Sequence, residues 1–453
     1  MTGRDIPTPQ RSSARKNETL FHGFGNNLKN GIWPRSAPLW MAGFYVSLFI
    51  LKPWDQIFPW LGAIHFARIY AICMILVILM SSKKRLKLSF MTFAVLYFYF
   101  TILISGIFAW DPSLAWNPIY IYTTLLVFYF VLITVILSEY DLLFIVICYV
   151  LAMAIYLAKA QWEFFIHNHH VYRMGVARLI GIESMHGAPN GLAISIVASL
   201  PMLLFLWVYR KEVSSTWPNV WQKWFSRILV MYAFLAVSSI VLTNSRSGMA
   251  TFIVFVILSF GLGKGIGRMI KSAVLGVIIL GIIWQVMPES NKNRFRTLWN
   301  PAMGPANAEA SAEGRLEGFK AGIKMFKRRP ISGVGVGNFV AYRVRYVDGV
   351  KLQAHNLIGQ VLGETGALGF SAFTLLVITT LVNCKKVKVL AEGKSDPPLV
   401  ALSGLTFAIR NSLILLLFAG LAGHNLLRFN WLWLAAFSAL SFVFANDYVK
   451  KIK

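Results

Sequence analysis

The segment KLQAHNLIGQVLGETGALGF (residues 351–370) places a histidine and an asparagine where a polar stretch becomes an apolar helix. Four-residue spacing puts His355, Gly359 and Gly363 on one helical face, with Asn356 beside them. Two glycines below a histidine leave a groove that a substrate or another helix can enter. Two interpretations follow: His355 is a general base that faces a substrate, or it belongs to a helix-packing face.

Arg246, in VLTNSRSGMATF, stands in a very short turn between two apolar runs. A helix begins there, so free backbone N–H groups and the positive end of the helix dipole add to the charge of the arginine. The neighbours Asn244, Ser245 and Ser247 are residues that cap helices. Because a guanidinium matches the geometry of phosphate oxygens, we predict an anion site at Arg246. The alternative is an arginine that extends to the membrane–water interface.

Other segments add candidates of the same kind. Arg315 opens a second basic helix in AEGRLEGF, where an anion site competes with an ordinary surface arginine. Arg178 and Asn190 lie in YRMGVARLIGIESMHGAPNGLA, and Asn190 can also cap the apolar run that follows it. The stretch GHNLLRFNW holds a second His-Asn pair, so His424 is the fallback for the base and Arg428 is a further substrate-binding candidate.

A metal site has little support from the residue pattern. His167, His169 and His170 cluster in IHNHHVYR, but acidic partners around them are sparse. GVGVGNF lacks the βαβ context of a dinucleotide site, and the sequence has no P-loop and no G-x-S-x-G motif. No metal spacing or disulfide framework is present among the three cysteines, Cys73, Cys148 and Cys384. One histidine with several arginines suits displacement of a diphosphate without a metal or cofactor.

The composition is that of an all-α, polytopic membrane protein. Hydrophobic residues make up 57% of the chain and charged residues 14%, whereas soluble domains carry about 25% charged residues. The net charge of +26 would suggest nucleic acid for a soluble protein. Here the basic residues separate apolar runs, so we predict contact with membrane lipids and no nucleic-acid partner.

Twelve segments are long and apolar enough for predicted membrane spans, although the first is short. They are residues 37–52, 58–80, 88–109, 117–138, 141–159, 191–209, 226–243, 247–263, 272–287, 356–383, 399–420 and 430–447. Arg68 and Arg410 fall within these spans, where charged residues usually face the bundle interior and are functional or paired.

The basic clusters in short loops predict the orientation of the chain. SSKKRLKL, CKKVKVLAEGKSDPP and the final KKIK all fall on one side, which the positive-inside rule assigns to the cytoplasm. Residues 1–36 then form a disordered basic cytoplasmic tail and residues 37–453 the membrane domain. Two long outer loops follow, at about 160–190 and 288–355, the second directly before the tenth span.

The second outer loop contains a predicted basic amphipathic helix, EGRLEGFKAGIKMFKRRP. It ends before Pro330 and lies either at the outer membrane–water boundary or in a small outer subdomain. The next helix is predicted to end its polar-faced section at Gly366. The apolar and basic residues of the amphipathic helix recur on opposite sides, at Leu316, Phe319, Ile323 and Phe326 against Lys320, Lys324 and Lys327.

These motifs resemble the O-antigen ligase and polymerase superfamily over roughly Arg173 to Leu381. The resemblance rests on PNGLA, NSRSGMA, GRLEGFKAG, RRPISGVGVGNF and AHNLIGQVLGETGALG, in that order. It implies a twelve-helix, C-type glycosyltransferase in the bacterial inner membrane with a periplasmic active site. Members take a glycan from undecaprenyl diphosphate. A ligase transfers it to a sugar hydroxyl of lipid A–core, and a polymerase transfers it to another carrier-linked repeat.

The same resemblance assigns roles to individual residues. His355 matches the catalytic histidine of the family. Arg246 and Arg315 match arginines that hold the diphosphate, and Arg178 fits the R-x-x-G that precedes the asparagine motif. Leu357 follows His-Asn where family ligases often carry an aromatic residue, so the type of acceptor stays open.

O-antigen ligase is the function we expect, and three alternatives remain. A polymerase of O-antigen or exopolysaccharide belongs to the same superfamily. A protein O-oligosaccharyltransferase would usually have larger periplasmic parts. A transporter or lipid-linked oligosaccharide flippase often shows two related halves, which this chain lacks.

Overall fold

The computed structural model describes residues 36–173, 176–182, 188–261 and 307–452, with single positions between 262 and 306. The first helices are α2 (Ala37–Leu51), α3 (Pro53–Gln56), α4 (Pro59–Ala63), α5 (Phe66–Met80), α6 (Phe90–Ile107), α7 (Pro112–Val135) and α8 (Glu139–Ile166). A hairpin of β1 (His170–Arg173) and β2 (Val176–Leu179) follows. Next come α9 (Pro189–Val208), α10 (Arg210–Val213), α11 (Asn219–Leu242), α12 (Arg246–Val256) and a π-helical turn, Ile257–Gly261. The last helices are α15 (Asn307–Arg328), α16 (Phe339–Tyr346), α17 (Leu357–Ala391), α18 (Pro397–Gly420) and α19 (Phe429–Ile452).

The prediction of an all-α membrane protein is confirmed. Within the described ranges, eight helices are long and apolar enough to cross a membrane: α6, α7, α8, α9, α11, α17, α18 and α19. The shorter apolar helices Ala37–Leu51, Phe66–Met80 and Arg246–Ser259 match three further predicted spans. Residues 1–35 of the predicted tail 1–36 lie outside the described residues, and so does the predicted span 272–287 apart from single positions.

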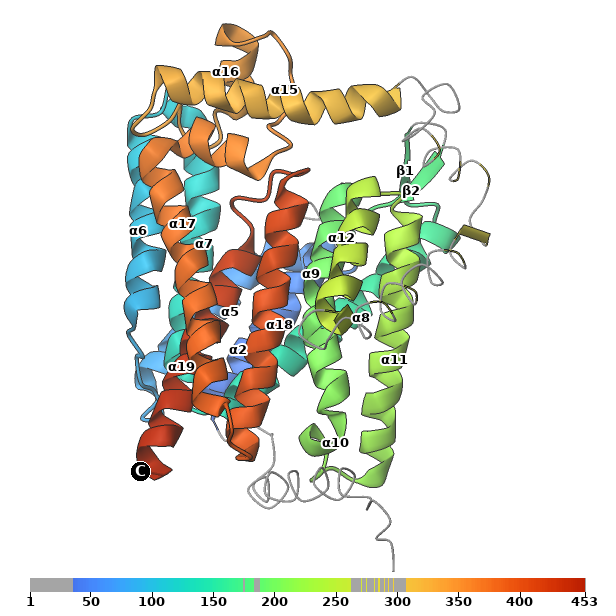
Figure 1. The fold of residues 1–453 in the computed structure, drawn as a ribbon, viewed down its shortest axis with the longest axis vertical. Helices are drawn as coiled ribbons and strands as arrows, with labels where there is room; N and C mark the ends of the chain where they lie inside the picture. The colour runs from blue at the N-terminus through green and yellow to red at the C-terminus, as the bar shows by residue number, and fades with distance from the viewer. Residues whose placement is uncertain are drawn as a thin grey trace, which may run out of the picture.

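The long helices form a bundle, and α15 lies across one end of it (Figure 1). Near the centre, α17 packs against α6, α18 and α19. Aromatic residues fill this contact: the ring of Phe373 on α17 lies 5.6 Å from that of Phe98 and 5.0 Å from that of Trp431. Trp431 is completely buried. A second group of helices, α8, α9, α11 and α12, packs beside the first (Figure 1).

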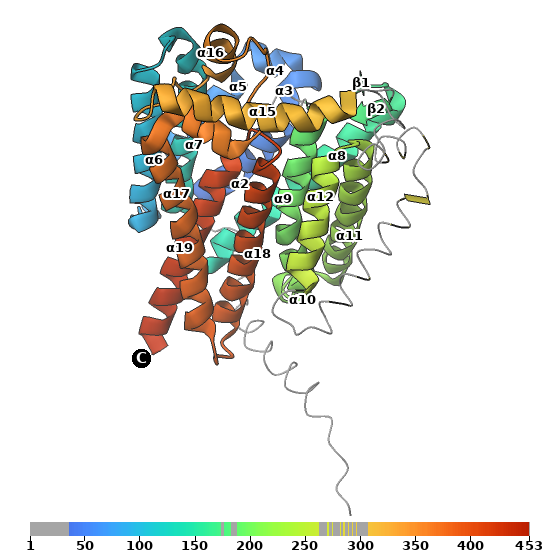
Figure 2. The same ribbon diagram turned by 45° about the horizontal axis from the view of Figure 1, so that its top comes forward.

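The two ends of the bundle differ in their connections. Figure 2 shows α3, α4, α15 and α16 at one end, whereas α10 and the C-terminus lie at the other. The end with the C-terminus carries Lys450 and Lys451 of the final basic cluster, together with Arg210 and Lys211 of α10. The separation of the ends therefore agrees with the predicted sidedness.

The segment 330–338 interlocks with a break in α17. Gly366 has φ 65° and ψ −160°, which interrupts the helix where the sequence predicted the end of its first section. The backbone N–H groups of Ala367 and Leu368 donate to Pro330 and Ile331 at 2.8 and 3.2 Å. A Cβ at Gly366 would lie 2.4 Å from the Ile331 oxygen, so only glycine fits both the backbone conformation and the space.

Two local expectations need correction. The loop predicted from residue 160 begins later, because α8 continues to Ile166, and β1 and β2 form a hairpin that was not predicted. Strands of four residues are too short to give a clear period-2 pattern. In α15 the predicted end before Pro330 is confirmed, but the buried face is different. Leu316 is 55% exposed, and the buried residues are Gly318, Ala321, Gly322 and Met325.

Candidate active site

His355 immediately precedes the N-cap of α17. Its backbone is left-handed, with φ 46°. The next residue, Asn356, accepts a hydrogen bond from the Gly359 backbone N–H at 2.9 Å and so caps the helix. The Asn356 side chain also donates to the Leu421 carbonyl at 3.2 Å, at the end of α18. His355 is therefore held on a turn that is fastened to two helices.

His424 contacts His355 directly. The ring centroids lie 5.0 Å apart, and the ring planes are inclined by 62°. The sequence offered these histidines as a first choice and a fallback, and the structure places both in one site.

A short polar chain holds the His424 loop against α17. The Leu426 backbone N–H donates to the Gln360 side chain at 3.4 Å. Gln360 in turn donates to Glu364 at 3.1 Å, and Glu364 accepts from the Gly337 backbone N–H at 3.2 Å. The polar helix face that begins at Asn356 thus joins both the His424 loop and the GVGVGNF loop to α17.

His424 has a depressed pKa. Water reaches the ring, but protein surrounds it on most sides. This burial, followed by the His355 ring and the Arg428 guanidinium, lowers the pKa of His424 to about 4. His424 is therefore neutral near pH 7.

Arg315 reaches the site through the packing of α15 on α17. Gly318, one turn further along α15, lies so close to Ala354 that a Cβ on it would be 1.9 Å from the Ala354 carbonyl oxygen. Ala354 directly precedes His355. Arg315 is half-buried, and burial, followed by the charge of Arg246, lowers the pKa of its guanidinium. The two arginines therefore lie near enough to repel each other, although both stay charged.

Arg246 begins α12 at the turn that the sequence predicted. Ser245 caps the helix by accepting from the Gly248 backbone N–H at 3.1 Å. The Ser245 hydroxyl donates to Asn190 at 2.8 Å. Arg246 is half-buried, and the first backbone N–H groups of α12 lie beside it.

Arg178 supports this turn. Its side chain is buried and donates to the Thr243 carbonyl at 2.9 Å and to Asn190 at 3.0 Å. Arg178 and Asn190 therefore hold the backbone that presents Arg246.

Arg428 completes a ring of contacts around the site. It donates to the Gly191 carbonyl at 3.2 Å and to the Ser195 hydroxyl at 2.7 Å, on the first turns of α9. Asn190 is on the same turn of α9, and the charge of Arg428 also acts on His424. The ring runs from Arg246 through α9 to Arg428, then through the two histidines and α15 back to Arg315.

The sequence was compared with known protein families and curated proteins. Residues 231–374 match the family model described as O-antigen ligase. This match supports the resemblance to the O-antigen ligase and polymerase superfamily and does not distinguish a ligase from a polymerase. The match includes Arg246, Arg315, His355 and Asn356, and it ends before His424. No curated protein matches the chain.

The groove beside His355 is filled by helix α15. A Cβ at Gly322 of α15 would lie 2.2 Å from the Gly359 carbonyl oxygen, and a Cβ at Gly363 would lie 3.2 Å from the Gly322 Cα. Of the two occupants predicted for this groove, the structure contains the helix. The two G-x-x-x-G segments, Gly318–Gly322 and Gly359–Gly363, let the backbones approach closely.

Sequence reasoning missed the residues that hold the segment before His355. Arg343 on α16 is 1% exposed and pairs with Asp348, with Nη2 and Oδ2 2.8 Å apart. It also donates to the Leu352 carbonyl at 3.4 Å. A rare acidic residue five positions after an arginine is the only sequence signal for this pair.

Two histidines of the cluster that suggested a metal site contact nearby residues of α8 instead. His167 lies 2.7 Å from a Glu163 carboxylate oxygen, and the ring of His170 packs near that of Phe164. Lys159 also pairs with Glu163. Across the part of the chain that the structure describes, no three His, Cys, Asp or Glu residues are arranged to hold a metal.

Proposed function

We propose that this protein is an O-antigen ligase: an inverting, metal-independent glycosyltransferase that uses undecaprenyl diphosphate as the glycan carrier. The acceptor is a sugar hydroxyl of lipid A–core. The site is proposed to face the periplasm, with both chain termini in the cytoplasm, in the bacterial inner membrane. The observation that supports the proposal is that Arg315 lies one helical turn before the contact of Gly318 with Ala354, beside His355, and is close enough to Arg246 for their charges to interact.

The chemistry follows from these groups. His355 takes the proton of the acceptor hydroxyl as general base. The acceptor oxygen bonds to the anomeric carbon while the bond from that carbon to the diphosphate oxygen breaks. Undecaprenyl diphosphate leaves with added negative charge, which Arg246 and Arg315 stabilise. Direct displacement inverts the anomeric centre. Because two arginines supply the positive charge, the reaction needs no divalent cation.

The supporting residues divide into two groups. Arg178, Asn190 and Asn356 make structural hydrogen bonds around the turns that carry Arg246 and His355. They act as positioning residues in this proposal. His424, whose ring lies 5.0 Å from that of His355, and the nearby Arg428 are proposed to face the acceptor, and the neutral His424 can share a hydrogen bond with it.

A polymerase is the second candidate function. Leu357 stands where family ligases often carry an aromatic residue, and its side chain is 3% exposed because it packs against Gly420. An aliphatic packing residue at this position gives no aromatic surface for a core sugar. Under this alternative, His355 and the arginines keep their roles and the acceptor is a carrier-linked repeat.

A lipopolysaccharide gel separates the two functions. A deletion strain is compared with the same strain carrying the wild-type chain or His355→Ala. Loss of the entire O-antigen ladder, with polymer accumulating on undecaprenyl diphosphate, identifies a ligase. A surviving band of core plus one repeat identifies a polymerase. An unchanged ladder would contradict both and direct the search to exopolysaccharide or glycoprotein.

The predicted metal independence and the predicted inversion at the anomeric carbon are tested with the purified protein. In a nanodisc with donor and lipid A–core, transfer should be unaffected by EDTA, and the new linkage should have the opposite anomeric configuration from the donor. Loss of activity in EDTA with recovery in Mg²⁺ would contradict the arginine-only mechanism.

A further inference from the structure

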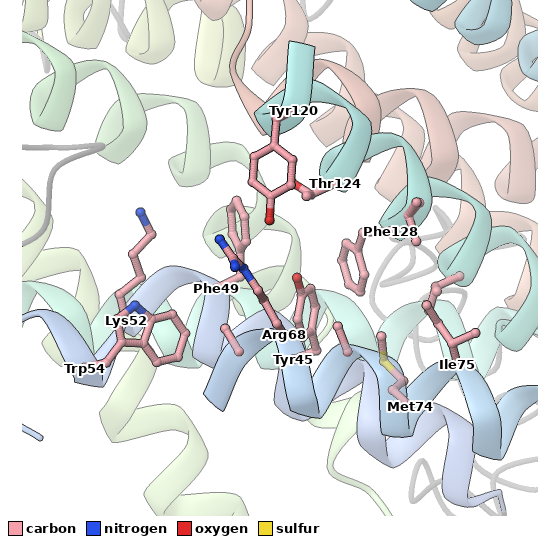
Figure 3. A pocket seen from close by; sticks show the side chains of 14 residues that line it. Tyr45, Phe49, Lys52, Trp54, Arg68, Met74, Ile75, Tyr120, Thr124 and Phe128 are labelled. Atoms are coloured by element: carbon pink, nitrogen blue, oxygen red, sulfur yellow. The ribbon is translucent and has the colours of Figure 1, made fainter. Parts of the chain in front are cut away.

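A second site of chemical interest lies outside the ring of contacts described above. Helices α2, α5 and α7 enclose a cavity of about 370 Å³ (Figure 3). None of the residues assigned to glycan transfer lines it. We call it the lateral pocket and define it by Lys52, Arg68, Tyr120, Met74, Ile75 and Phe128.

One end of the lateral pocket is cationic. Lys52 follows α2 in a left-handed conformation with φ 39°, and Arg68 lies in the first turn of α5. The Arg68 guanidinium lies 5.7 Å from the centre of the Tyr120 ring, and Figure 3 shows it directed toward that ring. Residues 52–68 contain these two cations and one carboxylate, Asp55. Arg68 lies near the start of the helix that matches the predicted span 58–80, and its side chain is exposed.

The rest of the lateral pocket is apolar. Met74 and Ile75 on α5 and Phe128 on α7 extend away from the cations (Figure 3). Val127 and Val131 continue the same wall of α7. A ligand that fits therefore has a negative head and a long hydrocarbon part.

The lateral pocket opens toward the surroundings of the bundle. Two of its lining residues are exposed large side chains, Tyr120 at 51% and Val127 at 43%. The adjoining face of α5 presents Ile72 and Leu76, which are also exposed. In a multi-pass membrane protein, such an apolar face contacts lipid chains, so a lipid can enter from the side.

We propose that the lateral pocket is a binding site for a phosphate-bearing lipid. The phosphate lies between Lys52 and Arg68, where the arginine fork accepts its oxygens. One hydrocarbon chain lies against Met74, Ile75 and Phe128. The cationic end is at the same end of the bundle as α15, because α3 and α4 begin just after Lys52 (Figure 2).

The lateral pocket is linked to the proposed active site through one pair of aromatic rings. Phe49 lines it and packs edge to face on Phe429, with ring centroids 5.2 Å apart. Phe429 directly follows Arg428. A bound lipid would therefore stand behind the loop that carries His424 and Arg428. The binding claim itself does not depend on glycan transfer.

Native mass spectrometry of the full-length protein in detergent tests this inference. The probes are phosphatidylglycerol and phosphatidylcholine with identical acyl chains, undecaprenyl phosphate, and inorganic phosphate as a competitor. We expect phosphatidylglycerol and undecaprenyl phosphate to bind at least tenfold more tightly than phosphatidylcholine, and inorganic phosphate not to displace them. The double variant Lys52→Gln/Arg68→Gln should lose about tenfold in affinity for the anionic lipids.

Two further variants complete the design. Ala71→Phe narrows the apolar part and should weaken every lipid while leaving the charges intact. Lys324→Gln/Lys351→Gln removes the same charge from exposed positions at the same end and should change nothing. The inference is overturned if the Lys52/Arg68 variant keeps wild-type affinity, if both phospholipids bind equally, or if inorganic phosphate displaces the lipid. A lowered melting temperature of Ala71→Phe would indicate a folding defect, whereas an unchanged one would indicate that the new side chain fills the pocket. The Lys52/Arg68 variant tests the binding of the lipid phosphate independently of Ala71→Phe.

Discussion

The imidazole rings of His355 and His424 meet edge to face, with centroids 5.0 Å apart. Each is followed by an asparagine whose side chain is used to hold a loop: Asn356 donates to Leu421, and Asn425 donates to Leu416. The two histidines are nonetheless unequal. His355 directly precedes the helix that packs against α15, whereas His424 is kept neutral by its surroundings.

The two histidines should therefore differ in their effect on transfer. We expect His355→Ala to lower kcat by about 10²–10⁴-fold, the range for loss of a general base. His424→Ala should lower it by less than about tenfold, because His424 only shares a hydrogen bond. Transfer is measured with purified protein and a labelled donor. Wild-type activity in His355→Ala would make His424 the base.

Loss of either arginine should weaken stabilisation of the leaving diphosphate. Arg315→Gln and Arg246→Gln are each expected to lower kcat/KM by about 10²-fold or more. Arg315→Lys keeps the charge and should recover part of that loss, since a lysine lacks the planar fork. Lys327→Gln, an exposed change on the same helix, is the control. Equal activity of Arg315→Gln and the control would remove Arg315 from the site.

The close packing of α15 on α17 should be sensitive to a single methyl group. Gly318→Ala places a Cβ against the Ala354 carbonyl, so α15 must shift, at a cost of about 1–3 kcal/mol. Transfer should fall because the shift moves both Arg315 and the residue before His355. Gly314→Ala, one turn earlier, meets nothing within 4 Å and should be neutral or stabilising. Equal melting temperatures and activities for the two variants would contradict this packing.

The depressed pKa of His424 should make the fold sensitive to mild acid. The unfolded chain binds a proton at an ordinary histidine pKa near 6.5, whereas the folded chain binds it only near pH 4. Protonation therefore favours the unfolded state, and this part of the stability is lost as the pH falls from about 6.5 toward 4. The melting temperature of wild type should fall between pH 7 and pH 5 by roughly 1–3 °C more than that of His424→Gln. Identical pH profiles would show that His424 titrates normally.

The ion pair of the buried Arg343 with Asp348 should contribute more to the free energy of unfolding than an exposed ion pair at the same end of the bundle. Asp348→Asn leaves the buried Arg343 guanidinium without its carboxylate, at a cost of about 3 kcal/mol. The hydrogen bonds from Arg343 lower the pKa of Asp348, so the pair persists until the pH falls below the usual range for aspartate. Glu317→Gln breaks the exposed pair with Lys320 and should cost about 0–1 kcal/mol. Thermal unfolding compares them, and equal losses would contradict the structural role of Arg343.

Much of this protein could be predicted from its sequence because the signals were local. Apolar runs located the long helices, and serine at a helix start with an adjacent arginine located the Arg246 turn. Gly366 was recognised as a break because glycine tolerates the required conformation. In each case the relevant residues are neighbours in the chain.

The parts that were not predicted depend on contacts between distant segments. The four-residue spacing of Gly318 and Gly322 was visible, but only the position of α17 reveals why those residues are buried and Leu316 is exposed. His355 and His424 look like competing candidates in a linear sequence. Arg428 is a simple basic residue until its contacts with Gly191 and Ser195 are known.

The ring of contacts has a consequence for biogenesis. Its members are drawn from β2, α9, the start of α12, α15 and the loop between α18 and α19. Since membrane helices are inserted from the N-terminus as the chain is made, the early helices reach the bilayer before His424 and Arg428 have left the ribosome. A nascent chain halted after α18 would expose its arginines to lipid phosphates without the loop that completes the ring. The complete ring thus forms late in synthesis, when the last helix enters the membrane.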